Sequence, residues 1–143
     1  MIPRTALPEI LREIEEMSAA CGLRVANVFH AGDGNLHPLV LYDQRVEGQE
    51  QQAEELAGEI IRRCVAHGGS ITGEHGVGAE KRAHMPVMFT DADMATHQLI
   101  RCALDPNNLC NPEKVYPTPR LCGETPGPYR PHPLEVAGLA ERF

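Results

Sequence analysis

The sequence has few aromatic residues, no cluster of lysine and arginine, and no long apolar run. Aromatic residues make up 4% of the chain, and its formal net charge is −7. Nucleic-acid binding needs a basic surface or aromatic stacking platforms, so we expect no nucleic-acid partner. A membrane helix needs roughly 20 consecutive apolar residues, and residues 1–11 lack the apolar core of a signal peptide. We therefore expect a soluble, cytoplasmic chain with no membrane span.

The cysteines are scattered and include no Cys-x-x-Cys pair. That spacing is typical of zinc knuckles and iron–sulfur clusters, so we expect neither. A dispersed, odd-numbered set is typical of reduced thiols in an intracellular protein. We therefore expect free cysteines, several of them packed in the core: Cys21, Cys64, Cys102, Cys110 and Cys122.

The length and the apolar pattern predict one α+β domain over residues 1–104, with helices on one face of a mainly antiparallel sheet. Eight of the twelve prolines lie between residues 106 and 133, so residues 105–143 are predicted to be an extended, proline-rich tail. The predicted sheet is small for this length, which indicates that strands are missing. The predicted elements are helix 6–21 (ended by Gly22), strands 23–30 and 36–43, helix 49–67, a short strand at 70–72, and helix 91–103 with Asp91 as its N-cap.

Two histidines flank the turn between the predicted strands. Asp33 and Gly34 are a strong signal for a two-residue β-turn. In that register His30 faces His37, with Cβ atoms roughly 5 Å apart on one face of the sheet, where both imidazoles can bind one metal ion. The apolar residues on that face would give the site a dry floor: Ala26, Val28, Leu39 and Leu41. A longer or bulged loop would break the pairing, and two unrelated histidines at strand ends are the alternative.

Zinc normally has at least three protein ligands, and the glycine-rich stretch 68–82 can supply the third. Glu74 added to the two imidazoles would complete a site with open positions, as in catalytic metal centres. The adjacent His75 would then be left to act as a general base. The alternative is a glycine-rich turn with an exposed Glu and His.

Other motifs and histidines are excluded from this site. The phosphate-loop spacing G-x-x-x-x-G-K-[ST] and the zinc-protease motif H-E-x-x-H are both absent. The remaining histidines are expected to be solvated: His67, His84, His97 and His132.

Three stretches, in this order, resemble the C-terminal part of FAD-linked 2-hydroxy-acid oxidases and dehydrogenases. That family includes the glycolate oxidase flavoprotein subunit, D-lactate dehydrogenases and D-2-hydroxyglutarate dehydrogenase. The first and last residues of the chain resemble the glycolate oxidase type most. The stretches are VANVFHAGDGNLHPLVLYD, GGSITGEHGVGAEKR and ALDPNNLCNPEKVYP.

The resemblance implies roles at the matching positions. His30, His37 and Glu74 match the family's divalent-metal ligands, for which Zn²⁺, Mn²⁺ and Fe²⁺ are all suitable. His75 matches the base that takes the hydroxyl proton while the α-hydride leaves for the flavin of FAD. The metal would hold the hydroxyl and carboxylate oxygens of the substrate.

The resemblance also implies supporting roles for three other residues. Asn35 would support the metal ligands, and Arg4 would bind a substrate carboxylate. Asn111 would lie near the flavin, with a structural turn as the alternative.

Two departures from the family pattern matter. Glu113 stands where members often have glycine. The FAD-binding domain and the first part of the substrate domain, which is built around a ferredoxin-like sheet, do not precede the matching region. The chain therefore resembles a C-terminal fragment or the product of a split gene, and we expect it to have no oxidase activity alone.

Two other functions stay open. One is a non-catalytic module with a structural metal, docking a partner such as an iron–sulfur electron-transfer subunit, which would make the chain peripheral to a membrane through its partners. The other is a free-standing metal hydrolase in which His75 activates water. An open sheet edge also makes a homo-oligomer an option.

Overall fold

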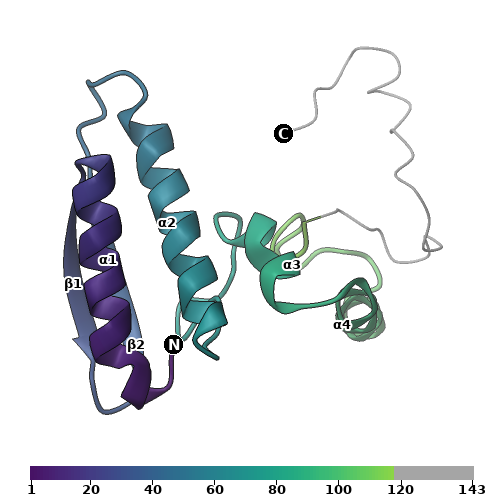
Figure 1. The fold of residues 1–143 in the computed structure, drawn as a ribbon. Helices are drawn as coiled ribbons and strands as arrows, with labels where there is room; N and C mark the ends of the chain where they lie inside the picture. The colour runs from purple at the N-terminus through teal and green to yellow at the C-terminus, as the bar shows by residue number, and fades with distance from the viewer. Residues whose placement is uncertain (118–143) are drawn as a thin grey trace.

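The computed structural model describes residues 1–117. In this part of the chain, β1 (Arg24–His30) and β2 (Asn35–Leu41) form a two-stranded antiparallel sheet. The helices α1 (Leu7–Cys21) and α2 (Gln49–Ala66) lie side by side against one face of this hairpin (Figure 1). The predicted α+β class is therefore confirmed. The remaining elements are η1 (Arg4–Ala6), η2 (Arg82–His84), α3 (Met85–Met88) and α4 (Asp91–Leu104).

Helix α1 forms where the sequence pattern predicts it. Its apolar residues recur at helical spacing, and Ile10 and Ile14 on that face are fully buried. Burying one such side chain stabilises the fold by about 1.5–3 kcal/mol. The helix ends at Gly22, whose left-handed backbone (φ 73°) lets its N–H donate to the carbonyl of Ser18 at 3.0 Å.

Helix α2 supplies the other half of the core. Its buried face packs with that of α1 against the inner face of the sheet, and Gly68 (φ 77°) follows its end. The buried core residues are Ile2, Ile10, Ile14, Leu23, Ala53, Leu56, Ile60 and Cys64, with Val25, Leu36 and Val40 of the sheet packed against them.

The outer face of the sheet carries the histidines and is open. Val28 is 53% exposed, Leu39 is 52% exposed and Leu41 is 45% exposed. These residues do share a face with His30 and His37, as the alternation along a strand requires. The expected dry floor is nonetheless wrong for the described residues, because these apolar side chains remain about half exposed.

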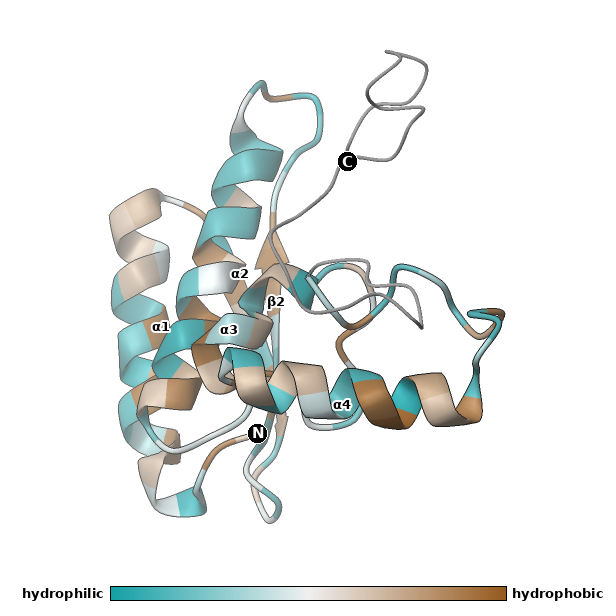
Figure 2. Cartoon of the chain, turned by 90° about the vertical axis from the view of Figure 1, so that its right-hand side faces the viewer, coloured by the Kyte–Doolittle hydropathy of each residue, from teal (hydrophilic) through white to brown (hydrophobic). Residues whose placement is uncertain are grey.

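The N-cap of α4 lies one residue earlier in the chain than predicted. Thr90, not Asp91, is the N-cap: its hydroxyl accepts from the N–H of Asp93 at 3.2 Å, and the Asp93 carboxylate accepts from the N–H of Thr90 at 2.9 Å. This capping box satisfies two backbone donors at once, whereas Asp91 alone would satisfy one. Figure 2 shows apolar residues along α4, and two of them are largely exposed, Leu99 at 71% and Leu104 at 83%.

Three further expectations can be compared with the structure. Residues 70–72 form no strand, so that prediction is wrong: within 1–117 the sheet contains only β1 and β2. Cys21, Cys64 and Cys110 are free, whereas Cys102 is disulfide-bonded, so the expectation of reduced thiols fails at Cys102. Most of the predicted tail 105–143 lies outside the described residues, and so does Cys122.

Among the helices of residues 1–117, none is long and apolar enough to cross a membrane.

Candidate metal and substrate site

The turn between the strands has four residues, 31–34, rather than two. His30 is paired with Asn35 and His37 with Val28, so the predicted pairing of His30 with His37 is wrong by two residues. A shift of two keeps every side chain on its face, whereas a shift of one would reverse them all. The two imidazoles therefore still project from one face, as diagonal neighbours, with ring centroids 5.5 Å apart and planes at 87°.

A contact outside the hairpin explains the longer turn. A type I′ turn needs positive φ at both central residues. Of the two residues expected there, Asp33 and Gly34, only Gly34 has a positive φ, of 68°. Asp33 instead closes a turn with its N–H donated to the carbonyl of His30 at 3.0 Å. Gly34 also accepts from the N–H of Ile2 at 2.8 Å, and a Cβ at this position would collide with the Ile2 carbonyl.

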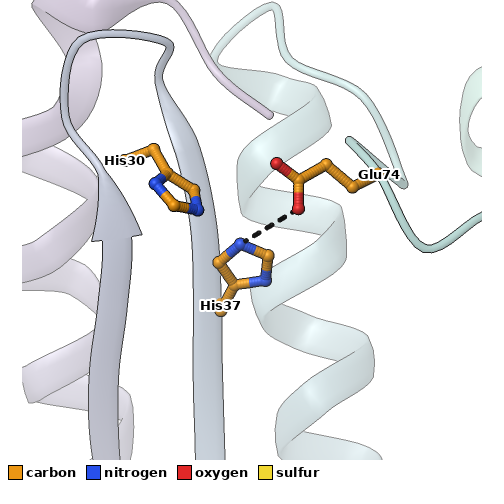
Figure 3. A group of neighbouring side chains, drawn as sticks. All are labelled: His30, His37 and Glu74. Atoms are coloured by element: carbon orange, nitrogen blue, oxygen red, sulfur yellow. Dashed lines mark ion pairs between the residues drawn. The ribbon is translucent and has the colours of Figure 1, made fainter.

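Glu74 completes a three-residue cluster with the two histidines, as Figure 3 shows. One ligand atom from each of His30, His37 and Glu74 lies within 4.8 Å of the others. His37 Nε2 is 3.6 Å from Glu74 Oε2, which is too long for a good hydrogen bond. The glycine-rich segment therefore returns to the open end of the hairpin and brings its carboxylate to the imidazoles.

The donor set fits a divalent transition metal. Ligand atoms about 2.0–2.1 Å from a tetrahedral ion are separated from each other by roughly 3.4 Å. The His37–Glu74 separation of 3.6 Å is close to that value, and the remaining separations need small side-chain rotations. Two imidazoles and one carboxylate leave at least one position of such an ion open.

Asn35 lies directly behind the cluster. It is only 3% exposed, and its Nδ2 is 3.4 Å from His37 Nε2. Gly73 leaves the space that the Asn35 side-chain amide occupies, since a Cβ at residue 73 would collide with Asn35 Oδ1. Asn35 thus joins the hairpin to the segment that carries Glu74.

His75 lies beside the cluster without being part of it. Its ring centroid is 5.1 Å from that of His37, with the planes at 34°, and the side chain is exposed. Gly76 (φ 77°) and Gly78 (φ 59°) follow with left-handed backbones. Glu74 and His75 are adjacent in the chain, and both side chains lie close to the His37 ring.

The other expected site residues lie elsewhere. Arg4 is exposed in η1, and neither the three-residue cluster nor the neighbouring cavity includes it. Asn111 has a left-handed backbone (φ 46°), and its carbonyl accepts from the Arg101 guanidinium at 2.9 Å. This geometry is that of a structural turn.

The stretch around Asn111 nevertheless contacts the glycine-rich segment. The N–H of Val115 donates to the carbonyl of Gly78 at 2.8 Å, and Arg82 Nη1 donates to the carbonyl of Glu113 at 2.7 Å. Glu113, which stands where relatives were expected to have glycine, has φ 62°. The position where the resemblance led us to expect glycine therefore has a backbone that favours glycine.

The histidines expected to be solvated are in contact with other groups. His67 Nε2 is 3.0 Å from Glu13 Oε1 and lies near Glu9, which makes a second group of possible ligand atoms. The signal that could have found it is the i, i+4 pair of glutamates on α1 facing the end of α2. His84 packs against Gly58, and His97 packs edge-on against Phe89 with ring centroids 5.1 Å apart. His132 lies outside the described residues.

Comparison with known proteins places these stretches in one family. Residues 1–115 match the model of the C-terminal domain of FAD linked oxidases. The chain is 50% identical over 123 residues to "Glycolate oxidase subunit GlcD" of Escherichia coli, covering 86% of this chain and 25% of that protein. It is 31% identical over 115 residues to the protein of the same name in Bacillus subtilis, covering 80% and 24%.

A third relative carries a different name. The chain is 34% identical over 116 residues to "D-lactate dehydrogenase" of Archaeoglobus fulgidus, covering 80% of this chain and 25% of that protein. The chain thus spans about a quarter of the length of these relatives. With the family model matched over most of its length, the chain belongs to the FAD-linked oxidases and corresponds to their C-terminal domain.

Proposed function

We propose that this chain is the metal- and substrate-binding C-terminal domain of a FAD-dependent dehydrogenase acting on 2-hydroxy acids of the glycolate or D-lactate type. The observation that carries the proposal is the convergence of ligand atoms from His30, His37 and Glu74 within 4.8 Å. The names of the relatives, glycolate oxidase subunit and D-lactate dehydrogenase, support the substrate class.

His30, His37 and Glu74 would hold Zn²⁺, Mn²⁺ or Fe²⁺, which as a Lewis acid lowers the pKa of a coordinated alcohol. His75, outside the ligand set and next to His37, would take up the proton of the substrate's hydroxyl. FAD, when bound by the rest of the protein, supplies the acceptor for the α-hydride. Asn35, buried beside His37, would limit the rotation of that imidazole by packing against it, because His37 Nε2 would itself be occupied by the metal.

Several finer assignments belong to the same proposal. Residues 1–104 would form the domain proper, with 105–143 as its tail. The word subunit in the names of the relatives supports an electron-transfer partner, for which we propose an iron–sulfur protein in the cytoplasm. Within residues 1–117 the outer edges of β1 and β2 have no further strand beside them, and they would permit association with a second copy.

Binding of Mn²⁺ and glycolate tests the function directly. Electron paramagnetic resonance of Mn²⁺ should show one ion bound per chain, and glycolate should alter the spectrum of the bound ion by displacing coordinated water. Acetate, which lacks the hydroxyl group, should do so much more weakly. Bound Mn²⁺ that is indifferent to glycolate would contradict a substrate site and favour a structural metal.

The chain alone should not turn over substrate. With glycolate or D-lactate and an artificial electron acceptor, we expect no oxidation, because the family's flavin is held mainly by the part of the relatives that this chain does not match. Clear turnover by the 143-residue chain would contradict the assignment.

A further inference from the structure

A cavity of about 590 Å³ lies next to the candidate metal site. Its walls come from β2, the middle of α2 and the glycine-rich segment, and it reaches the metal cluster through His37 and His75. A cavity of this size can hold a small organic acid with room to spare. The apolar side chains that line it are Leu36, Leu39, Val40, Ile60, Ile61, Ile71 and Val77, together with Pro38.

One lysine lies on the lining of this cavity. Among residues 1–117, Lys81 is the only Lys or Arg that lines the cavity, and its side chain is half-buried. None of the ion pairs formed within residues 1–117 includes it. The other titratable groups on the lining are His37, His75, the buried Cys64, the exposed Glu80 and the amino group of Met1.

The backbone around Lys81 is fixed by hydrogen bonds. Its N–H donates to the carbonyl of Val77 at 3.1 Å, and its carbonyl accepts from the N–H of His84 at 2.9 Å. The next residue, Arg82, uses its guanidinium on the carbonyl of Glu113 at 2.7 Å. The two adjacent cationic side chains therefore have different contacts. Arg82 donates a hydrogen bond to the 111–115 turn, whereas Lys81 lines the cavity.

A partly desolvated ammonium without an anionic partner is unfavourable. A carboxylate entering the cavity would form a charge-assisted hydrogen bond with it, one of the stronger contacts available to a protein. We propose that Lys81 is a substrate-binding residue that receives the carboxylate of the 2-hydroxy acid in this cavity. The proposal rests on the function proposed above and adds a recognition group for the substrate's charge.

Titration of glycolate into the Mn²⁺-loaded chain tests this role, with Lys81→Gln and Lys81→Met as variants. Lys114, the other lysine of the chain, does not line the cavity, so Lys114→Gln is the matched control. The Met1 amino group is common to all four proteins. Loss of one charge-assisted contact should weaken glycolate binding by roughly tenfold or more, while Mn²⁺ affinity and binding in Lys114→Gln stay unchanged.

Neutral glycolamide separates charge recognition from damage to the cavity. It carries the hydroxyl group but no carboxylate, so both Lys81 variants should bind it as the wild type does. Equal glycolate affinity in wild type and Lys81 variants would overturn the role of Lys81 and leave the proposed function standing. A wild-type chain that binds Mn²⁺ but no glycolate would overturn the proposed function and this inference together.

Discussion

At the scale of single residues, the site depends on small side chains that leave space for larger ones. Gly73 is the clearest case, because a Cβ there would collide with the buried Asn35 amide, which lies 3.4 Å from His37 Nε2. Groups that orient a metal ligand typically contribute 10–100-fold to metal affinity. The environment of His37 is thus set by a residue that cannot itself bind metal.

Gly73→Ala should therefore weaken binding of divalent metal by on the order of tenfold, because the Asn35 amide that packs beside His37 must shift. Isothermal titration with Zn²⁺ would measure the change. Gly32→Ala is the matched control: a Cβ there meets nothing within 4 Å. Equal metal affinity in the two variants would show that Asn35 does not orient His37.

Glu113 illustrates the opposite case, a side chain on backbone that suits glycine. Its φ of 62° costs a residue with a Cβ roughly 1–2 kcal/mol. Glu113→Gly should therefore stabilise the 111–115 turn, slowing hydrogen exchange of the Val115 N–H that donates to Gly78. Asn111→Gly should have a smaller effect, because asparagine tolerates left-handed backbone better. Faster exchange in Glu113→Gly would contradict this account.

At the scale of elements, local patterns predicted the helices well. Helix α1 was expected over 6–21 and spans Leu7–Cys21; α2 was expected over 49–67 and spans Gln49–Ala66. Both carry an apolar stripe at helical spacing, and a glycine with left-handed backbone follows within two residues of the end of each. Local periodicity is sufficient where an element packs along its whole length.

The hairpin shows what local patterns could not predict. The turn length depends on Ile2, which lies far from the turn in the sequence yet hydrogen-bonds to Gly34 and packs against it. The Asp-Gly signal describes an isolated hairpin, and this tertiary contact overrides it. The predicted pairing of His30 with His37 is wrong, and the two side chains share a face only because an even shift preserves it. The position of Glu74 beside them is also non-local, and periodicity gives no information about it.

The packing of η2 against α2 should depend on pH. Burial, and to a lesser degree the charge of Arg62, lowers the pKa of His84 below its ordinary value of 6.5. The folded state therefore disfavours the imidazolium. The stabilising contribution is complete above the ordinary pKa and is lost as pH falls through the lowered one.

Nuclear magnetic resonance titration of the His84 ring should give a pKa below 6.5, and Arg62→Gln should raise it. Arg12→Gln is the control, since Arg12 pairs with Glu16 on the exposed side of α1. A His84 pKa at or above 6.5, or one unaffected by Arg62→Gln, would contradict the proposed cause.

At the scale of the whole molecule, the fold leaves much apolar surface open. The outer face of the sheet exposes Val28, Leu39 and Leu41, and α4 exposes Leu99 and Leu104. The relatives are more than three times as long as this chain. The buried core holds α1, the sheet and α2 together. The candidate metal cluster lies at the edge of that core, where the hairpin turn contacts Ile2 and the glycine-rich segment.

The central claim is that His30, His37 and Glu74 bind one divalent metal ion. Elemental analysis of purified wild-type chain, His37→Ala and His67→Ala tests it most directly, because His67 belongs to the other group of possible ligands, with Glu9 and Glu13. We predict about one equivalent of transition metal in wild type and His67→Ala, and essentially none in folded His37→Ala. Metal that persists in His37→Ala, or is lost only in His67→Ala, would contradict the account.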